Sequence, residues 1–461
     1  MVRHIYQYNT HTERGFFLGP EHHSLYDLIA LNGNIVSHTP VSIAAFVSTT
    51  GKDFYIDPQT HAFQHATIHL KRDISDKEKG EPPKYDFKPS VARLARERLG
   101  GIFASVIDRD RPISLKAFLS DDNVNNSVIE SVCQSIGDFQ LKTMVNELDE
   151  EAKDLIGDTS KITPQFLVAP YFYLSATKWQ DWLKINSACY RKMKLFFRSK
   201  PVYFSLVMSK DVLDHHSGEI VSEISSLHPD GILLWIDDHR EELLEEEEVQ
   251  RYVSFLKQLR GVTSDLLNPH GGYLSTLLCH SEAGRLLSGV GHAMNYGEHR
   301  PVIPIGGGLP MAHFYFRSVH ARLRFADAAA VFVGKNWLET VESYKQNVCK
   351  CRQCQELINL KTSAEDAFLA YGESSPVTFA RRTGAIVRLS YPTPDAKLVA
   401  TKHYLYNKAL EFSEVRNRGF GELVAELKSI YDDLADDVGD ECCSHLIKWH
   451  SVLKDFPKFE H

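Results

Sequence analysis

The stretch Gly231-Ile-Leu-Leu-Trp-Ile-Asp237-Asp238 contains the clearest buried strand of the sequence. Its five consecutive apolar residues, bounded by a glycine and two acids, predict a short strand that is covered on both faces. Strands of this kind belong to parallel sheets that are packed against helices. The stretch therefore predicts an α/β fold.

Short apolar runs of this type alternate with helical patterns along the rest of the chain, except in residues 1–30, which show no clear pattern. Strands are predicted at 33–48 (strand, turn, strand), 54–57, 102–107, 165–174, 201–208, 265–268, 302–308 (strand, then glycines) and 326–333. Helices are predicted at 90–99, 120–160, 179–195, 212–227, 241–259, 273–287 and 313–323. About eight strands suit a (β/α)8 barrel, whose functional groups sit at the carboxyl ends of the strands. A doubly wound open sheet would show the same alternation.

The composition is that of an ordinary globular protein with a formal net charge of −8. This acidic balance argues against a surface covered with nucleic-acid contacts, because phosphate binding depends on lysine and arginine. A local basic run, Arg191–Lys200, is compatible with such a contact or with an ordinary solvated helix face. No apolar run of about 18 residues predicts a membrane span. The N-terminus also lacks the apolar segment of a signal peptide.

A cysteine cluster, Cys349-Lys-Cys351-Arg-Gln-Cys354, is the most specific motif of the sequence, and His403 opens a helical pattern downstream of it. Zinc takes thiolate and imidazole ligands tetrahedrally, and structural sites of the Cys3His type fill all four positions with protein. The soft sulfur ligands favour zinc over magnesium or calcium. These four residues are therefore the predicted ligands of a structural Zn2+. Clustered thiols also indicate a reducing, cytoplasmic location.

The cysteine motif and the segments that follow it resemble the zinc-binding end of the tRNA-guanine transglycosylases. The resemblance extends over His403-Tyr-Leu-Tyr-Asn-Lys-Ala-Leu-Glu-Phe and Arg418-Gly-Phe-Gly-Glu-Leu-Val-Ala-Glu-Leu-Lys. The gap before His403 is longer than is usual in that family, and an insertion around residues 373–394 accounts for it. The family consists of barrels with a zinc subdomain near the end. The resemblance therefore implies a TIM-like barrel at 1–335 and a zinc-binding subdomain with C-terminal helices at 336–461.

The resemblance also implies roles for residues at the strand ends. Asp57-Pro-Gln-Thr-His-Ala-Phe63-Gln64 stands where the family has Asp-Ser-Gly-Gly-Phe-Gln, so Asp57 is expected to contact the base and handle a proton. Asp237, with Asp238 beside it, corresponds to the acids that grip the guanine edge. The further base-binding candidates are Phe63, Gln64, Gly271 and Gly272. Glycines at such positions let the backbone approach a flat base, and Gly306–Gly308 falls in another candidate pocket loop.

The nucleophile is the weakest match to the family. The family motif Asp-x2-Phe-Asp-Cys-Val-x-Pro-Thr-Arg corresponds here to Phe325-Ala-Asp327-Ala-Ala-Ala-Val-Phe332, in which one aspartate remains. Asp327 or Asp238 is the candidate nucleophile, and a structural Asp327 is an equal alternative. A chain that has lost catalysis and acts as a noncatalytic partner subunit is a further alternative.

Departures of this kind from the tRNA motifs make the chain most similar to the branch of the superfamily that inserts 7-deazaguanine derivatives into DNA (the DpdA-like proteins). The resemblance implies exchange of guanine in DNA for a base such as 7-cyano-7-deazaguanine, through a covalent aspartyl-glycosyl intermediate. Accessory subunits would open or deliver the duplex, and no membrane is involved. The alternatives are a transglycosylase that acts on tRNA, a noncatalytic nucleic-acid-binding subunit, and a zinc-containing barrel for small molecules.

Overall fold

The computed structural model describes residues 2–9, 13–75, 82–120, 123–293, 298–303, 311–380 and 386–456. The chain divides into two compact units. The barrel unit comprises Met1–His239, Val253–Gly271 and Leu286–Ile305, and the helical unit comprises Arg240–Tyr252, Gly272–Arg285 and Gly306–His461. No helix in the described part of the chain is long and apolar enough to cross a membrane.

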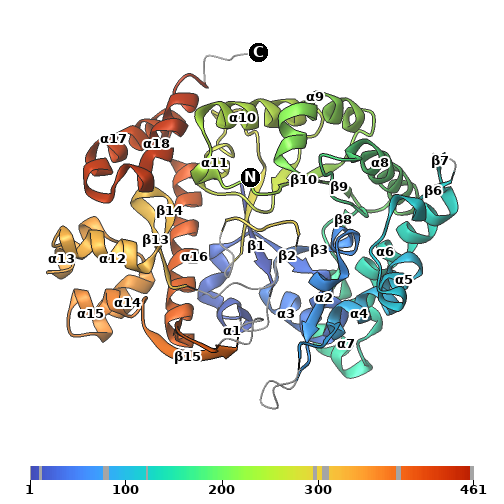
Figure 1. Ribbon diagram of the computed structural model, residues 1–461, viewed down its shortest axis with the longest axis horizontal. Coiled ribbons are helices and arrows are strands. Elements are labelled where there is room, and N and C mark those ends of the chain that lie inside the picture. The colour runs from blue at the N-terminus through green and yellow to red at the C-terminus, as the bar shows by residue number, and fades with distance from the viewer. Residues whose placement is uncertain are drawn as a thin grey trace. The chain divides into compact units, whose positions relative to one another are not determined.

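Eight parallel strands form a nearly closed barrel in the barrel unit (Figure 1). They are β1 (Arg3–Tyr8), β2 (Leu28–Asn32), β3 (Asp53–Asp57), β8 (Leu167–Val168), β9 (Val202–Met208), β10 (Gly231–Ile236), β11 (Leu266–Asn268) and β12 (Gly289–Ala293). The order around the sheet is β3-β2-β1-β12-β11-β10-β9-β8, so strands that are consecutive in this series are neighbours. Next to β8, the Gln165 amide donates to the Phe54 carbonyl of β3 at 2.8 Å, which brings the two edges together. The α/β, TIM-like barrel architecture expected from the sequence is confirmed.

Every residue of β9 and β10 is buried, as the continuous apolar runs predict. Their inward side chains meet those of the other strands in one hydrophobic cluster, with members that include Leu28, Tyr55, Tyr203, Leu233 and Leu267. The barrel interior is thus a packed core, and the strand ends are left to carry polar side chains.

Helices of the barrel unit surround this sheet. The principal ones are α2 (Gly33–His38), α3 (Pro40–Thr50), α5 (Gly101–Arg109), α6 (Asn126–Asn146), α8 (Trp179–Phe196) and α9 (Lys210–Ser225). The helices predicted at 179–195 and 212–227 are confirmed by α8 and α9. The helix predicted at 241–259 corresponds to α10 (Glu246–Arg260), whose residues are divided between the two units.

Several predicted strands are helices, because a short apolar run does not distinguish a strand from a buried helix. The two strands predicted within 33–48 are wrong, since α2 and α3 occupy that segment. The strand predicted at 102–107 lies in α5, where Phe103, Val106 and Ile107 are buried at helical spacing. The strand predicted at 326–333 lies in α12 (Phe325–Gly334).

Two predicted helices also differ from the structure, and the N-terminal segment, for which no element is predicted, contains strands. Residues 313–323 form the antiparallel pair β13 (His313–Phe316) and β14 (Ala321–Arg324) instead of a helix. The helix predicted at 273–287 is shorter, because α11 spans Tyr273–Leu277. Strand β1 and most of β2 lie within residues 1–30, in which the sequence shows no clear pattern. Val302 and Ile303 are not in a strand, and Gly306–Gly308 lies outside the described residues.

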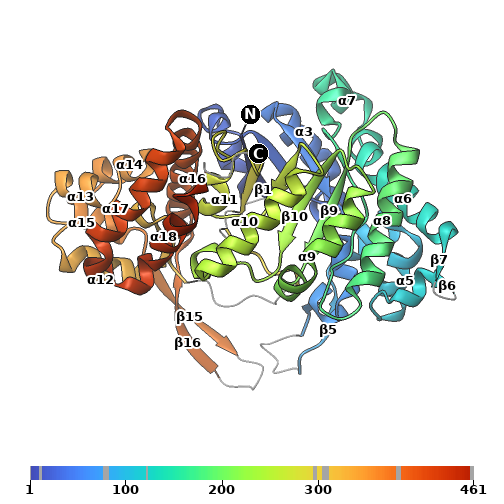
Figure 2. The same cartoon turned by 90° about the horizontal axis from the view of Figure 1, so that it is seen from above.

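The helical unit is built mainly from helices, with two small hairpins. Its helices after α12 are α13 (Val341–Asn347), α14 (Arg352–Leu360), α15 (Ala364–Leu369), α16 (Pro394–Asn417), α17 (Phe420–Val438) and α18 (Asp440–Leu453). The second hairpin, β15 (Ser374–Ala380) with β16 (Ile386–Pro392), projects from these helices (Figure 2). It occupies the segment in which the sequence predicts an insertion.

Candidate functional site

A pocket lies at the carboxyl ends of the strands in the barrel unit. Its lining comes from β1, β2, β3, β9, β10 and the segments that follow β8 and β11. Its empty volume of about 460 Å³ includes space open to solvent. Amide side chains (Gln7, Asn9, Asn32 and Gln59) and aromatic rings (Tyr55, Tyr171 and Trp235) make up much of the wall. This combination suits a flat ligand with several hydrogen-bonding groups.

Asp57 is the only carboxylate among the described residues that line this pocket. It is the last residue of β3, and its backbone pairs with Asn32 of β2. Its Oδ1 accepts hydrogen bonds from the Tyr171 hydroxyl at 2.7 Å and from the backbone N–H of Gln59 at 2.9 Å. Burial raises the pKa of Asp57, although these donors and the charge of Arg300 act in the opposite direction. The carboxylate is thus held in one orientation in a partly dehydrated site.

A cation and two histidines lie close to Asp57 in the same unit. The Arg300 guanidinium is 5.8 Å from the Trp235 ring, and the Trp235 indole donates to the Arg300 carbonyl at 3.0 Å. Burial, reinforced by the charge of Arg300, lowers the pKa of His270, which lines the pocket. Burial likewise lowers the pKa of His61, which stacks on Tyr171. Both imidazoles are therefore neutral near pH 7.

Asp237 and Gln64 form side-chain hydrogen bonds to backbone groups near the pocket, and Phe63 is buried. Asp237 Oδ1 accepts from the Val302 amide at 2.8 Å, and its Oδ2 accepts from the Tyr173 hydroxyl at 3.2 Å. The Gln64 side chain bonds both the amide and the carbonyl of Tyr173. Phe63 is buried against Phe103 in an edge-to-face contact. Asp237 and Gln64 thus position loops, Phe63 packs in the core, and none of the three predicted base-binding residues lines the pocket.

The other predicted catalytic carboxylates are exposed. The Asp238 side chain is 90% exposed and lies 3.9 Å from His299. Asp327 lies on α12 in the helical unit, where it forms an exposed ion pair with Arg324 at 2.6 Å. The structure does not bring either residue into the pocket that Asp57 lines.

The two predicted glycines fall on either side of the boundary between the units. Gly271 directly follows the pocket residue His270. Gly272 belongs to the helical unit, where a Cβ atom would lie 2.8 Å from the Glu241 carboxylate. Its lack of a side chain thus serves packing against Glu241.

Cys349, Cys351, Cys354 and His403 come together in the helical unit and are all buried. Their ligand atoms lie within 4.8 Å of one another, with His403 Nδ1 at 3.3 Å from Cys351 Sγ and 3.4 Å from Cys354 Sγ. Three sulfurs and one imidazole nitrogen around one point are the donor set of a tetrahedral site. This buried group can hold a metal ion such as zinc.

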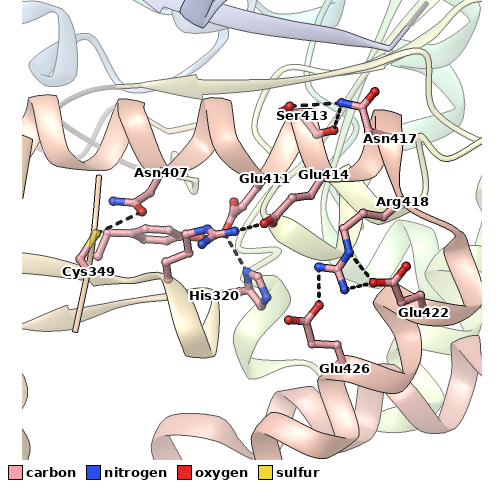
Figure 3. A network of polar contacts seen from close by, with 12 residues as sticks. His320, Cys349, Asn407, Glu411, Ser413, Glu414, Asn417, Arg418, Glu422 and Glu426 are labelled. Atoms are coloured by element: carbon pink, nitrogen blue, oxygen red, sulfur yellow. Dashed lines mark hydrogen bonds and ion pairs between the residues drawn. The ribbon is translucent and has the colours of Figure 1, made fainter. Parts of the chain in front are cut away.

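Outer contacts of this group match those of metal sites. His403 Nε2 lies 2.8 Å from the Tyr315 carbonyl, which fixes the proton on Nε2 and leaves Nδ1 to face the sulfurs. The Tyr344 and Tyr371 hydroxyls lie 3.3 and 3.2 Å from Cys354 Sγ. Asn407, one turn after His403 on α16, points its side chain toward Cys349 (Figure 3). These contacts would orient the ligands before an ion arrives.

A buried ion-pair network continues along the same face of α16. Lys408 and Glu411 have no exposed side-chain surface and are 2.9 Å apart. Glu411 also accepts from the Tyr315 hydroxyl and is bonded to His320 Nδ1, each at 2.7 Å (Figure 3). Burial alone would raise the pKa of Glu411, but Lys408 and His320 together lower it to about 2. The network therefore fixes α16 against β13 and the following turn.

The residues that sequence patterns missed come mostly from loops and from the two unrecognised strands. Tyr171 and Arg300 lie in irregular segments, and Gln7 lies on β1. Trp235 could have been found, because it lies on the predicted strand two residues before Asp237, and alternate residues of a strand face the same side of the sheet.

No family model and no curated protein matches this chain.

Proposed function

We propose that the protein is a transglycosylase that exchanges guanine in DNA for a 7-deazaguanine derivative. The observation that carries the proposal is the pocket at the strand ends, with one carboxylate, Asp57, among aromatic and amide side chains. The resemblance of the C-terminal third to the transglycosylase superfamily supplies the class of reaction.

The pocket walls suit a purine-type base that has left its stack. Tyr55, Tyr171 and Trp235 offer flat apolar surface, and the amides of Asn32 and Gln59 offer donors and acceptors to the base edge. The neutral His270 accepts a hydrogen bond from the Gln7 side chain at 3.1 Å, so its other ring nitrogen adds one donor without a second positive charge. These groups would replace the stacking and pairing that the base loses when it leaves a helix.

Asp57 is the residue through which the exchange would run. An oxygen of its carboxylate attacks C1′ of the sugar while the C1′–N9 bond breaks, and the bonding pair leaves with guanine, which takes up a proton. The incoming base then loses its N9 proton and attacks C1′, which releases the Asp57 carboxylate. Such a double displacement is the chemistry of retaining glycosidases. It assigns attack to Asp57, in place of Asp238 or Asp327.

The cysteine–histidine group would hold zinc in a structural role. Three thiolates and His403 fill the four positions of a tetrahedral ion, so no position is left for substrate. Zinc bound there would join α14 and the segment before it to α16, and it would take no part in the proposed reaction.

A noncatalytic nucleic-acid-binding subunit is the second candidate. It is favoured by the exposure of Asp238 and Asp327, which leaves one pocket carboxylate where the resemblance implies two. A subunit of this kind would keep a base-shaped pocket and lack the covalent step.

The proposal is tested by incubating the protein with radiolabelled guanine and, in separate reactions, duplex DNA, single-stranded DNA and bulk tRNA. Label is expected in DNA, and Asp57→Asn is expected to abolish it, because an amide does not form the glycosyl ester. Asp53→Asn is the matched control, since Asp53 lies at the exposed opposite end of the same strand. Label in tRNA alone would replace DNA by tRNA as the substrate. No label in any polymer would overturn the enzyme and leave the binding subunit.

A further inference from the structure

Arg300 supplies the positive charge in the described lining of the barrel pocket. With the carboxylate of Asp57 it is one of two charged side chains there, since burial keeps His270 neutral. No ion pair joins Arg300 to Asp57, and among the described residues the Arg300 guanidinium has no hydrogen-bond partner. The pocket therefore presents two opposite charges that do not neutralise each other, and a ligand can contact both of them.

The charge of Arg300 acts on the polar groups around it. Burial raises the pKa of Asp57, and the charge of Arg300 is among the influences that oppose this rise. Burial and the neighbouring Asp57 raise the pKa of Tyr171, and Arg300 again acts in the opposite direction. Burial lowers the pKa of His270, and Arg300 lowers it further. The guanidinium thus lies close to three groups that line the pocket from different strands and segments.

The backbone of Arg300 is held by the end of β10 and the residue after it. The Trp235 indole donates to the Arg300 carbonyl at 3.0 Å, and the Val302 amide donates to Asp237 Oδ1 at 2.8 Å. The guanidinium carbon lies 5.8 Å from the centre of the buried Trp235 ring. These contacts fix the segment that carries the cation before a ligand arrives, so that binding loses little conformational entropy there.

Arg300 also lies where (β/α)8 barrels commonly bind phosphate. In chain order β11 and β12 are the seventh and eighth barrel strands, and Arg300 follows β12 as His270 follows β11. The loops after these two strands frequently form the phosphate site of this fold. A guanidinium suits such a ligand, because its planar set of N–H donors matches two phosphate oxygens at once.

We propose that Arg300 binds a phosphate that flanks the reacting nucleotide, and that it thereby makes the pocket select a nucleotide within a strand over a free nucleoside. The inference rests on the proposed function and deepens it by assigning recognition of the nucleic-acid backbone to one pocket residue. During the double displacement the sugar develops positive charge beside Asp57, while the adjacent phosphate keeps its negative charge. The two charges of the pocket are opposite in sign to this pair. A neutral nucleoside would instead cover the guanidinium without supplying an anion.

The test is a double-mutant cycle between the protein and single phosphates of the DNA. Short single strands with one central guanine carry a methylphosphonate, which is uncharged and similar in shape, in place of the phosphate on the 5′ or the 3′ side of that guanine. Isothermal titration calorimetry measures the binding of each strand to the wild type and to Arg300→Gln. Arg109→Gln is the matched control, because Arg109 is an exposed arginine of α5 in the same unit and does not line the pocket.

We expect Arg300→Gln to weaken binding of the unmodified strand roughly tenfold and to reduce the salt slope by about 0.7, as for one lost phosphate contact on a single strand. In the wild type one of the two methylphosphonates should weaken binding by a similar factor, and its position identifies the phosphate that Arg300 contacts. The same methylphosphonate should cause no further loss in Arg300→Gln, because the contact is already absent. Arg109→Gln should give the wild-type values.

A methylphosphonate effect that is equal in the wild type and in Arg300→Gln would overturn the proposal, as would binding of the unmodified strand unchanged by Arg300→Gln or no binding of any strand. If Arg300→Gln does not fold, the cycle is measured with Arg300→Lys, which keeps the charge and loses the paired donors. The same methylphosphonate should then have a smaller effect than in the wild type, and an equal effect would overturn the proposal. Because binding is measured without base exchange, this coupling can be present in a protein that exchanges no base and absent in one that does.

Discussion

At the residue scale, Asp57 is the side chain on which burial and hydrogen bonding act in opposite directions. Burial raises the pKa of its carboxyl group, and the Tyr171 hydroxyl and the Gln59 amide counteract the rise. The charged form of Asp57 is therefore less favourable in the folded state than in the unfolded chain. A charged group of this kind can be needed for the chemistry and still lower the stability of the folded state.

Asp57→Asn is expected to make the protein more stable at pH 7 while abolishing base exchange. Because the folded-state pKa is raised above the ordinary value of 3.8, the charged form destabilises the folded state above that pKa, and the effect disappears as the pH falls below it. The melting temperatures of the two proteins should converge toward about pH 4. Calorimetry over this pH range checks the expectation, with Asp53→Asn as control. A variant that is less stable at pH 7 would contradict it.

Tyr171→Phe tests whether the Tyr171 hydroxyl helps to keep the Asp57 carboxylate ionised. The substitution removes a hydrogen bond to Asp57 and leaves the ring that lines the pocket, so the pKa of Asp57 rises further. The acid limb of the pH–rate profile for exchange should therefore move to higher pH. Base-exchange rates measured across pH give the answer, and an unmoved acid limb would show that Asp57 does not need to be charged.

At the element scale, α16 joins the cysteine–histidine group to the buried ion-pair network. His403 and Asn407 face the cysteines, and Lys408 and Glu411 lie in the next turn. A buried pair contributes little net stability when it is intact, but the loss of one partner leaves an uncompensated charge.

Glu411→Gln is expected to destabilise the protein by about 3–5 kcal/mol, because it leaves Lys408 buried without its carboxylate. Lys408→Met combined with Glu411→Gln should recover part of this loss. Since the folded-state pKa of Glu411 is lowered to about 2, its stabilising contribution is present above the ordinary value of 4.5 and is lost as the pH falls toward 2.

Urea unfolding measures these differences. Glu422→Gln is the control, because Glu422 is an exposed partner of Arg418 and should cost less than about 1 kcal/mol. Equal losses in Glu411→Gln and Glu422→Gln would contradict the assignment of a buried charge pair.

Elements with a clear period or a specific spacing could be predicted from the sequence. The continuous apolar runs correctly predict β9 and β10. The spacing of the cysteines, together with the helical pattern that His403 opens, predicts the four residues that the structure brings together. The short apolar runs of α3 and α5 predict strands equally well, because their apolar content is the same in either state and packing decides between them. The pocket could be anticipated through Asp57 and Trp235, whereas Tyr171 and Arg300 reach it from irregular segments that have no period.

At the scale of the whole molecule, two compact units are formed from alternating segments of one chain. The cysteine–histidine group lies wholly in one of them, on α14, the segment before it and helix α16. The effects of metal binding on folding should therefore be concentrated in that unit.

Cys351→Ser is expected to lose bound metal and to destabilise the helical unit, because a structural ion couples its ligands to folding. Metal analysis should find one zinc per chain in the wild type and less in the variant. Hydrogen exchange should lose protection in α14 and α16, while β9 and β10 keep theirs. Wild-type protein without zinc, or protection lost first in the barrel strands, would contradict this expectation.

The alternation of segments has a consequence for the growing polypeptide at the ribosome. Residues 240–252 and 272–285 are translated long before most of the helical unit to which they belong. The Glu241 carbonyl, for example, accepts a hydrogen bond from the Trp449 indole at 3.3 Å, and that tryptophan emerges about two hundred residues later. Until then these segments are exposed without their partners, so the nascent chain is expected to need a holding chaperone during elongation.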